Sequence, residues 1–214
     1  MTSRDHKQTA TPAATLERHE PVAVITLNRL EAMDAVNAAL SAAVGEALEE
    51  LAAYPELKVW VIIGADRAFC AGADLKELAA GQSLFAPSHP EWGFAGLVQH
   101  YMDKPLIAAV NGFALGGGTE IGAGLRSRGD ERAGQPREPE VKRGLFAAAI
   151  GLLRLGRQIP LEAALTGEPL DPATALRWGL VNRVVPPEDV LPVALELAGK
   201  IAENARSPCR PASA

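Results

Sequence analysis

The chain has 214 residues, of which 48% are hydrophobic, so it can bury the core of one domain but is short for two independent domains. Its formal net charge of −5 excludes a general electrostatic attraction to nucleic acid or to an anionic membrane. Two cysteines, Cys70 and Cys209, are too few for a disulfide framework or a zinc site, and we expect a reducing, cytoplasmic compartment.

The polar residues 1–19 lack the apolar run of a secretory signal, and we expect them to form a disordered leader. The longest apolar runs are far shorter than the about 20 residues that cross a membrane as a helix, so we expect no membrane-spanning helix. These boundaries predict one domain over residues 20–204 and a separate tail at 205–214.

Three stretches rich in β-branched residues and bounded by turn formers predict strands, at residues 21–28, 58–65 and 105–115. Their near-continuous apolarity indicates burial on both faces of a sheet. Between the first two strands, apolar residues recur at steps of three and four, which predicts an amphipathic helix with Asp34 as its N-cap.

The rest of the chain continues to alternate helical and extended patterns. Helices are expected over residues 94–102, 161–167, 172–178 and 191–204, and a short strand over residues 180–185. Strands that alternate with helices place the protein in the α/β class.

Residues 126–139, "RSRGDERAGQPREP", depart from this pattern, with four arginines, two glycines and two prolines. Such a segment buries too little apolar surface to offset its ordering entropy, so we expect no regular secondary structure in it. An RNA-binding loop is the alternative. However, Asp130, Glu131 and Glu138 nearly balance the arginines, and the segment has no aromatic residue for base stacking.

The stretch "AFCAGADLKEL", residues 68–78, follows directly on the second predicted strand and is rich in small residues. Gly72 allows a ligand to approach the backbone closely, and "DLKEL" can begin a helix whose N–H groups point towards an anion or a carbonyl oxygen. The alternative is an ordinary turn between a strand and a helix.

The stretch "NGFALGGGTE", residues 111–120, leads from the third predicted strand into three successive glycines and a carboxylate. Three glycines lose much backbone entropy on folding. A loop that presents backbone N–H groups to a developing oxyanion would compensate for that loss. A flexible turn is the alternative, although no Asn or Asp stands beside the glycines.

Glu120 and Glu140 both stand among small or apolar residues, twenty positions apart. Two carboxyl groups that share one cleft can divide the roles of general acid and general base. The spacing does not establish that they converge, and a surface position is the ordinary fate of a single glutamate.

Five motifs in order resemble the enoyl-CoA hydratase/isomerase family, the crotonase superfamily. They are "NRLEAMDAVN", "AFCAGADLKEL", "KPLIAAVNGFALGGGTE", "PEVKRGL" and "LTGEPLDPATALRWGLVNRVVP". The resemblance implies a crotonase-like spiral of ββα units and an acyl-CoA thioester substrate. It also implies assembly into trimers or dimers of trimers, and no cofactor, because coenzyme A is part of the substrate.

The resemblance also assigns the site. The two N–H groups of the oxyanion hole fall on Ala73 and Gly117, and the acid and base fall on Glu120 and Glu140. Coenzyme A would bind at Ala32 and Met33 and at the turn formed by Ala71, Asp74 and Leu75. No metal is implied. Both glutamates are kept, which favours an enoyl-CoA hydratase, with an isomerase or another crotonase reaction as the alternative.

The chain departs from the family pattern at residues 122–139 and after Ala205. The number of residues between Glu120 and Glu140 is the same as in the family, so the family sequence is replaced here and nothing is inserted. We interpret this segment as the product of a pair of compensating frameshifts. A further change near Ala205 would truncate the C-terminal helical region. Leu30 replaces a proline of the family and Asp34 an asparagine. A catalytically inactive, damaged family member that forms no discrete trimer is therefore a second hypothesis.

Overall fold

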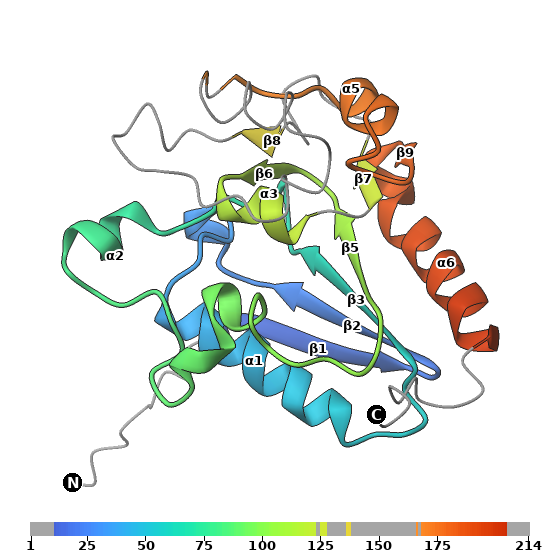
Figure 1. The fold of residues 1–214 in the computed structure, drawn as a ribbon, viewed down its shortest axis with the longest axis horizontal. Helices are drawn as coiled ribbons and strands as arrows, with labels where there is room; N and C mark the ends of the chain where they lie inside the picture. Colours follow the sequence, from blue (N-terminus) through green and yellow to red (C-terminus); the bar gives the residue numbers. More distant parts are fainter. Residues whose placement is uncertain (1–10, 123–124, 128–135, 138–165, 167, 205–214) are drawn as a thin grey trace, which may run out of the picture.

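The structure, a computed structural model, describes residues 11–122, 125–127, 136–137, 166 and 168–204 (Figure 1). Its strands are β1 (Ala14–His19), β2 (Val22–Leu27), β3 (Val59–Gly64), β4 (Ala68–Cys70), β5 (Leu106–Val110), β6 (Phe113–Leu115), β7 (Leu125–Ser127), β8 (Pro136–Arg137) and β9 (Val184–Val185). Its α-helices are α1 (Ala38–Ala52), α2 (Leu75–Ala79), α3 (Gly117–Ile121), α5 (Pro172–Arg177) and α6 (Val190–Asn204). Short 3-10 turns are η1 (Leu30–Ala32), η2 (Pro90–Trp92), η3 (Phe94–Gly96) and η6 (Pro187–Asp189).

The larger sheet has the strand order β1-β2-β3-β5-β7-β9. β1 runs antiparallel to β2, and the remaining neighbours are parallel, with Val24 opposite Val61 and Val61 opposite Ile107. Successive side chains of a strand point to opposite faces, so these strands bury apolar residues on both sides. The near-continuous apolar runs of the sequence are therefore explained.

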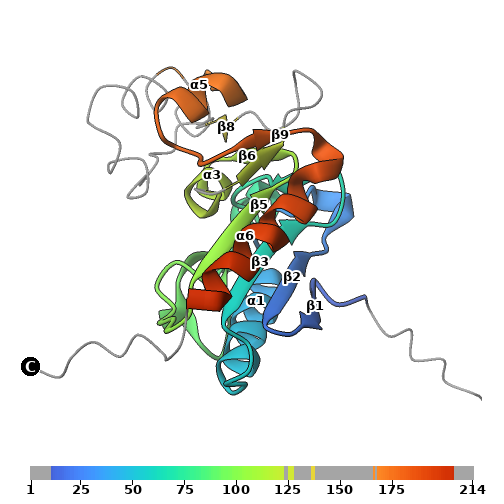
Figure 2. The ribbon, with the colours of Figure 1, turned by 90° about the vertical axis from the view of Figure 1, so that its right-hand side faces the viewer.

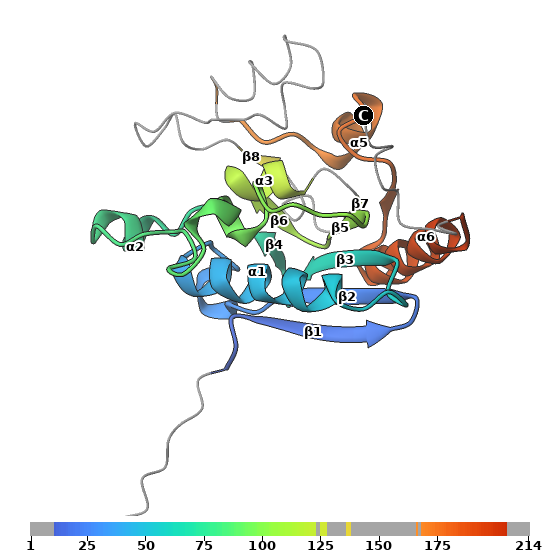
Figure 3. The ribbon, with the colours of Figure 1, turned by 60° about the horizontal axis from the view of Figure 1, so that its bottom comes forward.

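Two helices cover the two faces of this sheet (Figures 2 and 3). On one face Leu40, Val44, Leu48 and Leu51 of α1 pack against Ile25, Leu27, Trp60 and Ile62. On the other face Val190, Ala194, Ala198 and Ala202 of α6 pack against Val22, Val24, Val59 and Val61. The steps of three and four along α1, and of four along α6, place these residues on one stripe of each helix.

A smaller parallel sheet, in the order β4-β6-β8, lies at the end of the larger one (Figure 1). β4 and α2 follow β3 in the chain, and β6 and α3 follow β5, so the same ββα unit occurs twice in succession. This repetition is the spiral that the family resemblance implies. It brings the segments after β4 and β6 to one edge of the smaller sheet.

Most elements predicted from apolar patterns are confirmed, including the first two strands, the helix between them, and α5 and α6. The third predicted strand is divided into β5 and β6 at Asn111 and Gly112. The side-chain amide of Asn111 donates to the carbonyl oxygens of Gly64 and Asp66 at 2.9 and 2.6 Å, which ties this break to the end of β3.

Two predictions about helices are wrong. Asn37 caps α1, because its Oδ1 accepts the Leu40 amide at 3.0 Å, whereas Asp34 lies on the preceding loop. Residues 94–102 form no α-helix; η3 occurs there with Ala95 and Gly96 at φ angles of 58° and 65°. Left-handed residues interrupt an α-helix, so apolar spacing alone gave the wrong element.

Two further expectations are corrected. The expected leader contains β1, which pairs along its whole length with β2. The segment 126–139 contains the end of β7 and all of β8, so β5 gains a parallel neighbour at Val110 and Arg126. Strand pairing is made by backbone groups, which do not require apolar side chains, and Pro136 stands on an edge strand where a missing N–H is tolerated.

The remaining residues of that segment, the predicted helix at 161–167 except for residue 166, and the expected tail at 205–214 lie outside the described residues. Within the described part of the chain, no helix is long and apolar enough to cross a membrane.

Candidate active site

The turns that follow β4 and β6 touch each other. β4 and β6 are parallel, with Cys70 opposite Ala114, so both turns leave the same edge of the smaller sheet. Gly72 adopts a φ of +83°, and a Cβ atom added to it would lie 2.5 Å from the Leu115 carbonyl oxygen and 3.6 Å from the Gly117 nitrogen. Only glycine fits here, and its small size lets the two turns come into contact.

Ala73 is held from one side by Val36. The Val36 amide donates to the Gly72 carbonyl oxygen at 2.7 Å, and the Asp74 amide donates to the Val36 carbonyl oxygen at 2.9 Å. These two bonds form an isolated parallel bridge between Val36 and Ala73. Among the described residues, the Ala73 amide itself donates no hydrogen bond.

Gly117 is the first residue of α3, so its N–H group has no acceptor within the helix. The ring of Phe94 lies against its α-carbon, since an added Cβ would be 2.5 Å from the Phe94 Cε1 atom. The Thr119 hydroxyl donates to the Ala114 carbonyl oxygen at 2.8 Å and joins α3 to β6. The turn that carries the Gly117 amide is thus packed on both sides.

Of the two candidate acids, only Glu120 lies among the described residues. Glu120 belongs to α3, three residues after Gly117. Glu140 lies outside the described residues, so the convergence of the two carboxyl groups stays a prediction.

The candidate coenzyme A-binding residues come from two loops that are joined by hydrogen bonds. Ala32 ends η1, and Met33 follows it with a φ of 52°. The Met33 carbonyl oxygen accepts the Ala71 amide at 3.0 Å. Asp74 caps α2 by accepting the amides of Lys76 and Glu77, which places Leu75 in the first turn of α2. The structure therefore brings all five residues into two adjoining loops.

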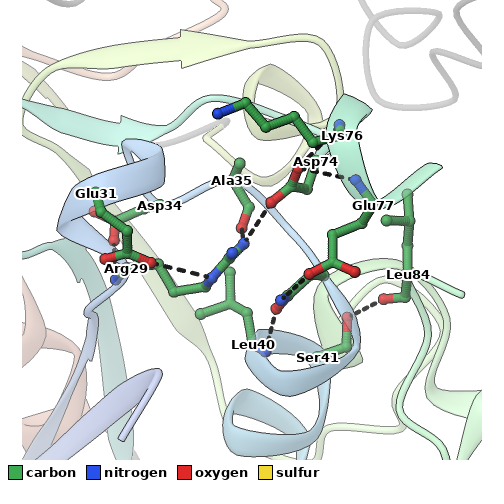
Figure 4. Close-up of polar contacts among 11 residues, drawn as sticks. Arg29, Glu31, Asp34, Ala35, Leu40, Ser41, Asp74, Lys76, Glu77 and Leu84 are labelled. Atoms are coloured by element: carbon green, nitrogen blue, oxygen red, sulfur yellow. Dashed lines mark hydrogen bonds and ion pairs between the residues drawn. The ribbon is translucent and has the colours of Figure 1, made fainter. Parts of the chain in front are cut away.

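A polar cluster, which we define as Arg29, Asp34 and Asp74, supports these loops (Figure 4). A guanidinium N–H of Arg29 donates to the Asp74 Oδ2 atom at 3.0 Å, and the Arg29 side chain also donates to the Ala35 carbonyl oxygen. The backbone amide of Arg29 donates to Asp34 Oδ1 at 2.6 Å. Side chains distant in sequence thereby connect the end of β2, the loop before α1 and the start of α2.

The two carboxyl groups of this cluster have opposite electrostatic settings. Asp34 is 1% exposed, and burial raises its pKa from an ordinary 3.8 to about 6 despite hydrogen bonds from the Arg29 and Ala65 amides. At Asp74, burial also opposes the charged form. There, hydrogen bonds from the Glu77 amide, the Arg29 side chain and the Lys76 amide hold the pKa below its ordinary value. The ionised form of Asp74 is thus stabilised by its surroundings, whereas ionising Asp34 costs free energy.

Sequence reasoning missed the roles of Arg29 and Phe94. Arg29 stands directly after the predicted strand at residues 21–28, in the motif "NRLEAMDAVN", but its partner Asp74 is 45 positions away. Phe94 was placed in an expected helix, and its contact with Gly117 arises from tertiary packing. The one available signal was Arg29 in the first motif together with one aspartate in each of the first two motifs, Asp34 and Asp74.

Cys70 is fully buried in the main core cluster. Burial raises the pKa of its thiol to about 12. The thiol therefore stays protonated at neutral pH, and Cys70 serves packing and not nucleophilic chemistry.

Comparison with known proteins defines the class. The enoyl-CoA hydratase/isomerase family matches residues 17–213. The chain therefore belongs to the enoyl-CoA hydratase/isomerase family, and it has the crotonase fold and is an enzyme of the hydratase/lyase kind.

Particular relatives agree with this assignment. A carnitinyl-CoA dehydratase of Salmonella paratyphi A is 39% identical over 196 residues, which are 89% of this chain and 74% of the relative. The solved structure of a carnitinyl-CoA dehydratase from Mycobacterium avium 104 is 51% identical, with a TM-score of 0.84 over 92% of this chain and 78% of that one. That of an enoyl-CoA hydratase from Mycobacterium tuberculosis H37Rv is 38% identical, with a TM-score of 0.80 over the same shares.

Proposed function

We propose that this protein is an enoyl-CoA hydratase, which adds water across the α,β double bond of an enoyl-CoA thioester and removes it in the reverse direction. The observation that carries the proposal is the contact between Gly72 and the Leu115–Gly117 turn. It brings the amides of Ala73 and Gly117 to the same edge of the smaller sheet. These amides would bind the thioester oxygen together.

The chemistry explains why two such donors are needed. When the water oxygen attacks C3 of the enoyl chain, the electrons of the double bond move to C2 and the thioester carbonyl. The resulting enolate carries negative charge on oxygen, and fixed N–H donors stabilise that charge without having to reorganise. The donors therefore act most strongly in the transition state, where they accelerate the reaction.

Glu120 and Glu140 would share the two proton transfers. One glutamate, as the carboxylate, accepts a proton from the attacking water. The other glutamate, as the carboxylic acid, donates a proton to C2. The two transfers leave the pair with its original number of protons, and the elements of water are added to the substrate. No electron enters or leaves, so the reaction needs no redox cofactor.

Coenzyme A would bind at Ala32, Met33, Ala71, Asp74 and Leu75. The contact between the loops that carry these residues supports this assignment, because one nucleotide-bearing ligand can touch both loops at once. The Ala71 and Ala73 amides also stand in the same turn. Coenzyme A bound there would have its thioester near the proposed oxygen-binding donors.

Carnitinyl-CoA is a second candidate substrate, favoured by the carnitinyl-CoA dehydratases of Salmonella paratyphi A and Mycobacterium avium 104. The same site would serve it, because removing water from a 3-hydroxyacyl-CoA is the reverse of the proposed hydration. Comparing kcat/KM for crotonyl-CoA hydration and carnitinyl-CoA dehydration by the full chain would rank the two.

The test of the proposal is the hydration rate of a short enoyl-CoA, followed by the loss of ultraviolet absorbance of the conjugated thioester. We expect Glu120→Gln and Glu140→Gln each to lower kcat by about 10²-fold or more, because each removes an acid/base group. Glu46→Gln, at an exposed position of α1, is the matched control and should leave the rate unchanged. An unchanged rate in Glu140→Gln would remove that residue from the mechanism, and an inactive wild-type chain would favour the damaged-member hypothesis.

A further inference from the structure

The polar cluster supports the two loops and also lies beside the peptide group between Gly72 and Ala73. Arg29 is only 14% exposed at its side chain and Asp74 only 11%, so their ion pair is largely shielded from water. The same guanidinium group binds the Ala35 carbonyl oxygen. Arg29 therefore joins the residue before Val36 to the residue after Ala73.

The peptide between Gly72 and Ala73 has its direction set by Val36. Its carbonyl oxygen accepts the Val36 amide at 2.7 Å. In a trans peptide the C=O and N–H bonds point in opposite directions. The Ala73 N–H group consequently points away from Val36, and it is held in that direction as long as Val36 keeps its place.

The other side of the same segment is also blocked. Gly72 lies against the Leu115 carbonyl oxygen, where even a Cβ atom would be too close at 2.5 Å. The Gly72–Ala73 segment thus has Val36 on one side and the Leu115–Gly117 turn on the other. It can reorient only if the Val36 bond breaks, and the Arg29 contacts oppose that break.

We propose that Arg29 is a positioning residue that aims the Ala73 amide at the thioester oxygen of the bound substrate. The proposal rests on the proposed function, in which Ala73 is one of two oxygen-binding donors. Arg29 acts through the Ala35–Val36 backbone and through Asp74 and does not touch the substrate. A displacement of a donor by about 1 Å is enough to lower a catalysed rate by about 10²-fold.

The type of side chain matters for this role. A guanidinium group is planar and carries five N–H donors, so it can serve the Ala35 oxygen and the Asp74 carboxylate together. A lysine ammonium carries the same charge on a point-like group with a different reach. Arg29→Lys should therefore keep the charge of the cluster and lose part of its geometry.

A direct phosphate-binding role for Arg29 is the alternative. The contacts argue against it, because Asp74 neutralises the guanidinium charge at 3.0 Å and Glu31 lies 3.8 Å from the Arg29 Nε atom. A phosphate would have to compete with both carboxylates. The two roles differ in their kinetics: positioning changes kcat, whereas phosphate binding changes KM.

The experiment compares Arg29→Gln and Arg29→Lys with wild-type enzyme as full chains. The matched control is Arg18→Gln, which removes another arginine, one that pairs with Glu50 and lies over the Tyr54 ring at 3.9 Å. We expect Arg29→Gln to lower kcat by about 10²-fold with KM changed less than about threefold. Arg29→Lys should be intermediate, and Arg18→Gln should match the wild type.

The second readout is the infrared carbonyl stretch of bound butyryl-CoA labelled with carbon-13 at its thioester carbon. Hydrogen bonds from aimed donors lower this frequency, so the wild-type shift should shrink in Arg29→Gln and partly return in Arg29→Lys. The readout needs binding and not turnover, so it separates failure of this inference from failure of the proposed function. An unchanged stretch, or a rise in KM with kcat preserved, would overturn the inference. If Arg29→Gln does not fold, Arg29→Lys decides by the same two readouts.

Discussion

Replacing Asp34 by asparagine should stabilise the protein, although it alters a buried residue in the middle of a hydrogen-bonded loop. Asp34 is 1% exposed, and its Oδ1 atom accepts the Arg29 amide at 2.6 Å. Asparagine has an oxygen in the same place and can accept the same bond. Asp34 also has a φ of 56°, a conformation in which asparagine is enriched. The substitution therefore removes a charge and keeps the hydrogen bond from Arg29.

The size of the effect follows from the pKa. Burial raises the pKa of Asp34 from 3.8 to about 6, so the folded chain binds a proton more readily than the unfolded chain between these values. Stability consequently falls as pH rises from about 4 to 6, and the loss is complete above pH 6. The difference of roughly two pKa units corresponds to about 3 kcal/mol, which is the upper limit of the gain from Asp34→Asn at pH 7.5.

The measurement is urea unfolding of both proteins, followed by circular dichroism at pH 4, 6 and 7.5. We expect the free energy of unfolding of Asp34→Asn to exceed that of the wild type by about 1–3 kcal/mol at pH 7.5 and to be similar at pH 4. Asp103→Asn, at an exposed position, is the control and should change stability by less than about 0.5 kcal/mol. Parallel pH profiles for wild type and Asp34→Asn, or a loss of stability at pH 7.5, would refute the reasoning.

Two further predictions concern the glycines of the site. Gly72→Ala would place a Cβ 2.5 Å from the Leu115 oxygen, so we expect the hydration rate to fall at least about 10²-fold. The control is Gly81→Ala, because Gly81 has a similar φ of +72° but an added Cβ would meet no atom within 4 Å; this variant should keep its activity. Both rates come from the enoyl-CoA absorbance assay, and equal losses would contradict the close contact. Gly117→Ala would meet the Phe94 ring at 2.5 Å, so its activity should also fall, and Phe94→Ala in the same chain should restore part of it. Additive losses in this double variant would show that the ring does not cause the defect.

The fold was largely predictable where apolar patterns decide the structure. The strands β2, β3 and β5 and the helix α1 bury continuous or periodic apolar residues, which the sequence displays directly. At α5, the N-cap Asp171 and the following Pro172 are local start signals as well. These elements are determined by neighbours in sequence and by burial.

The segment from His89 to His100 was not predictable in the same way. Trp92 is stacked between the rings of His89 and His100, with centroids 4.1 and 4.9 Å away, and its ring lies against Gly45 of α1. The contact between Trp92 and Gly45 joins residues 47 positions apart, and the segment contains the left-handed residues Ala95 and Gly96. The spacing of its apolar residues resembles a helix, but tertiary packing determined the conformation.

The candidate site was predictable in its parts but not in its assembly. The glycines at residues 72 and 116–118 indicated two turns that expose backbone amides, and both are present as turns at the edge of the smaller sheet. The contact between these turns and the bridge from Val36 to Ala73 depend on the register of distant segments. Convergence of Glu120 and Glu140, the frameshift interpretation and the oligomeric state stay predictions.

The central claim is that this chain adds water to an enoyl-CoA, and the most direct test is the fate of the water oxygen. Crotonyl-CoA would be incubated with the full chain in water enriched in oxygen-18, and the product analysed by mass spectrometry. The account predicts 3-hydroxybutyryl-CoA with one labelled oxygen at C3, formed at a rate that Glu140→Gln lowers by about 10²-fold. A product with a shifted double bond and no label, or no product at all, would contradict it.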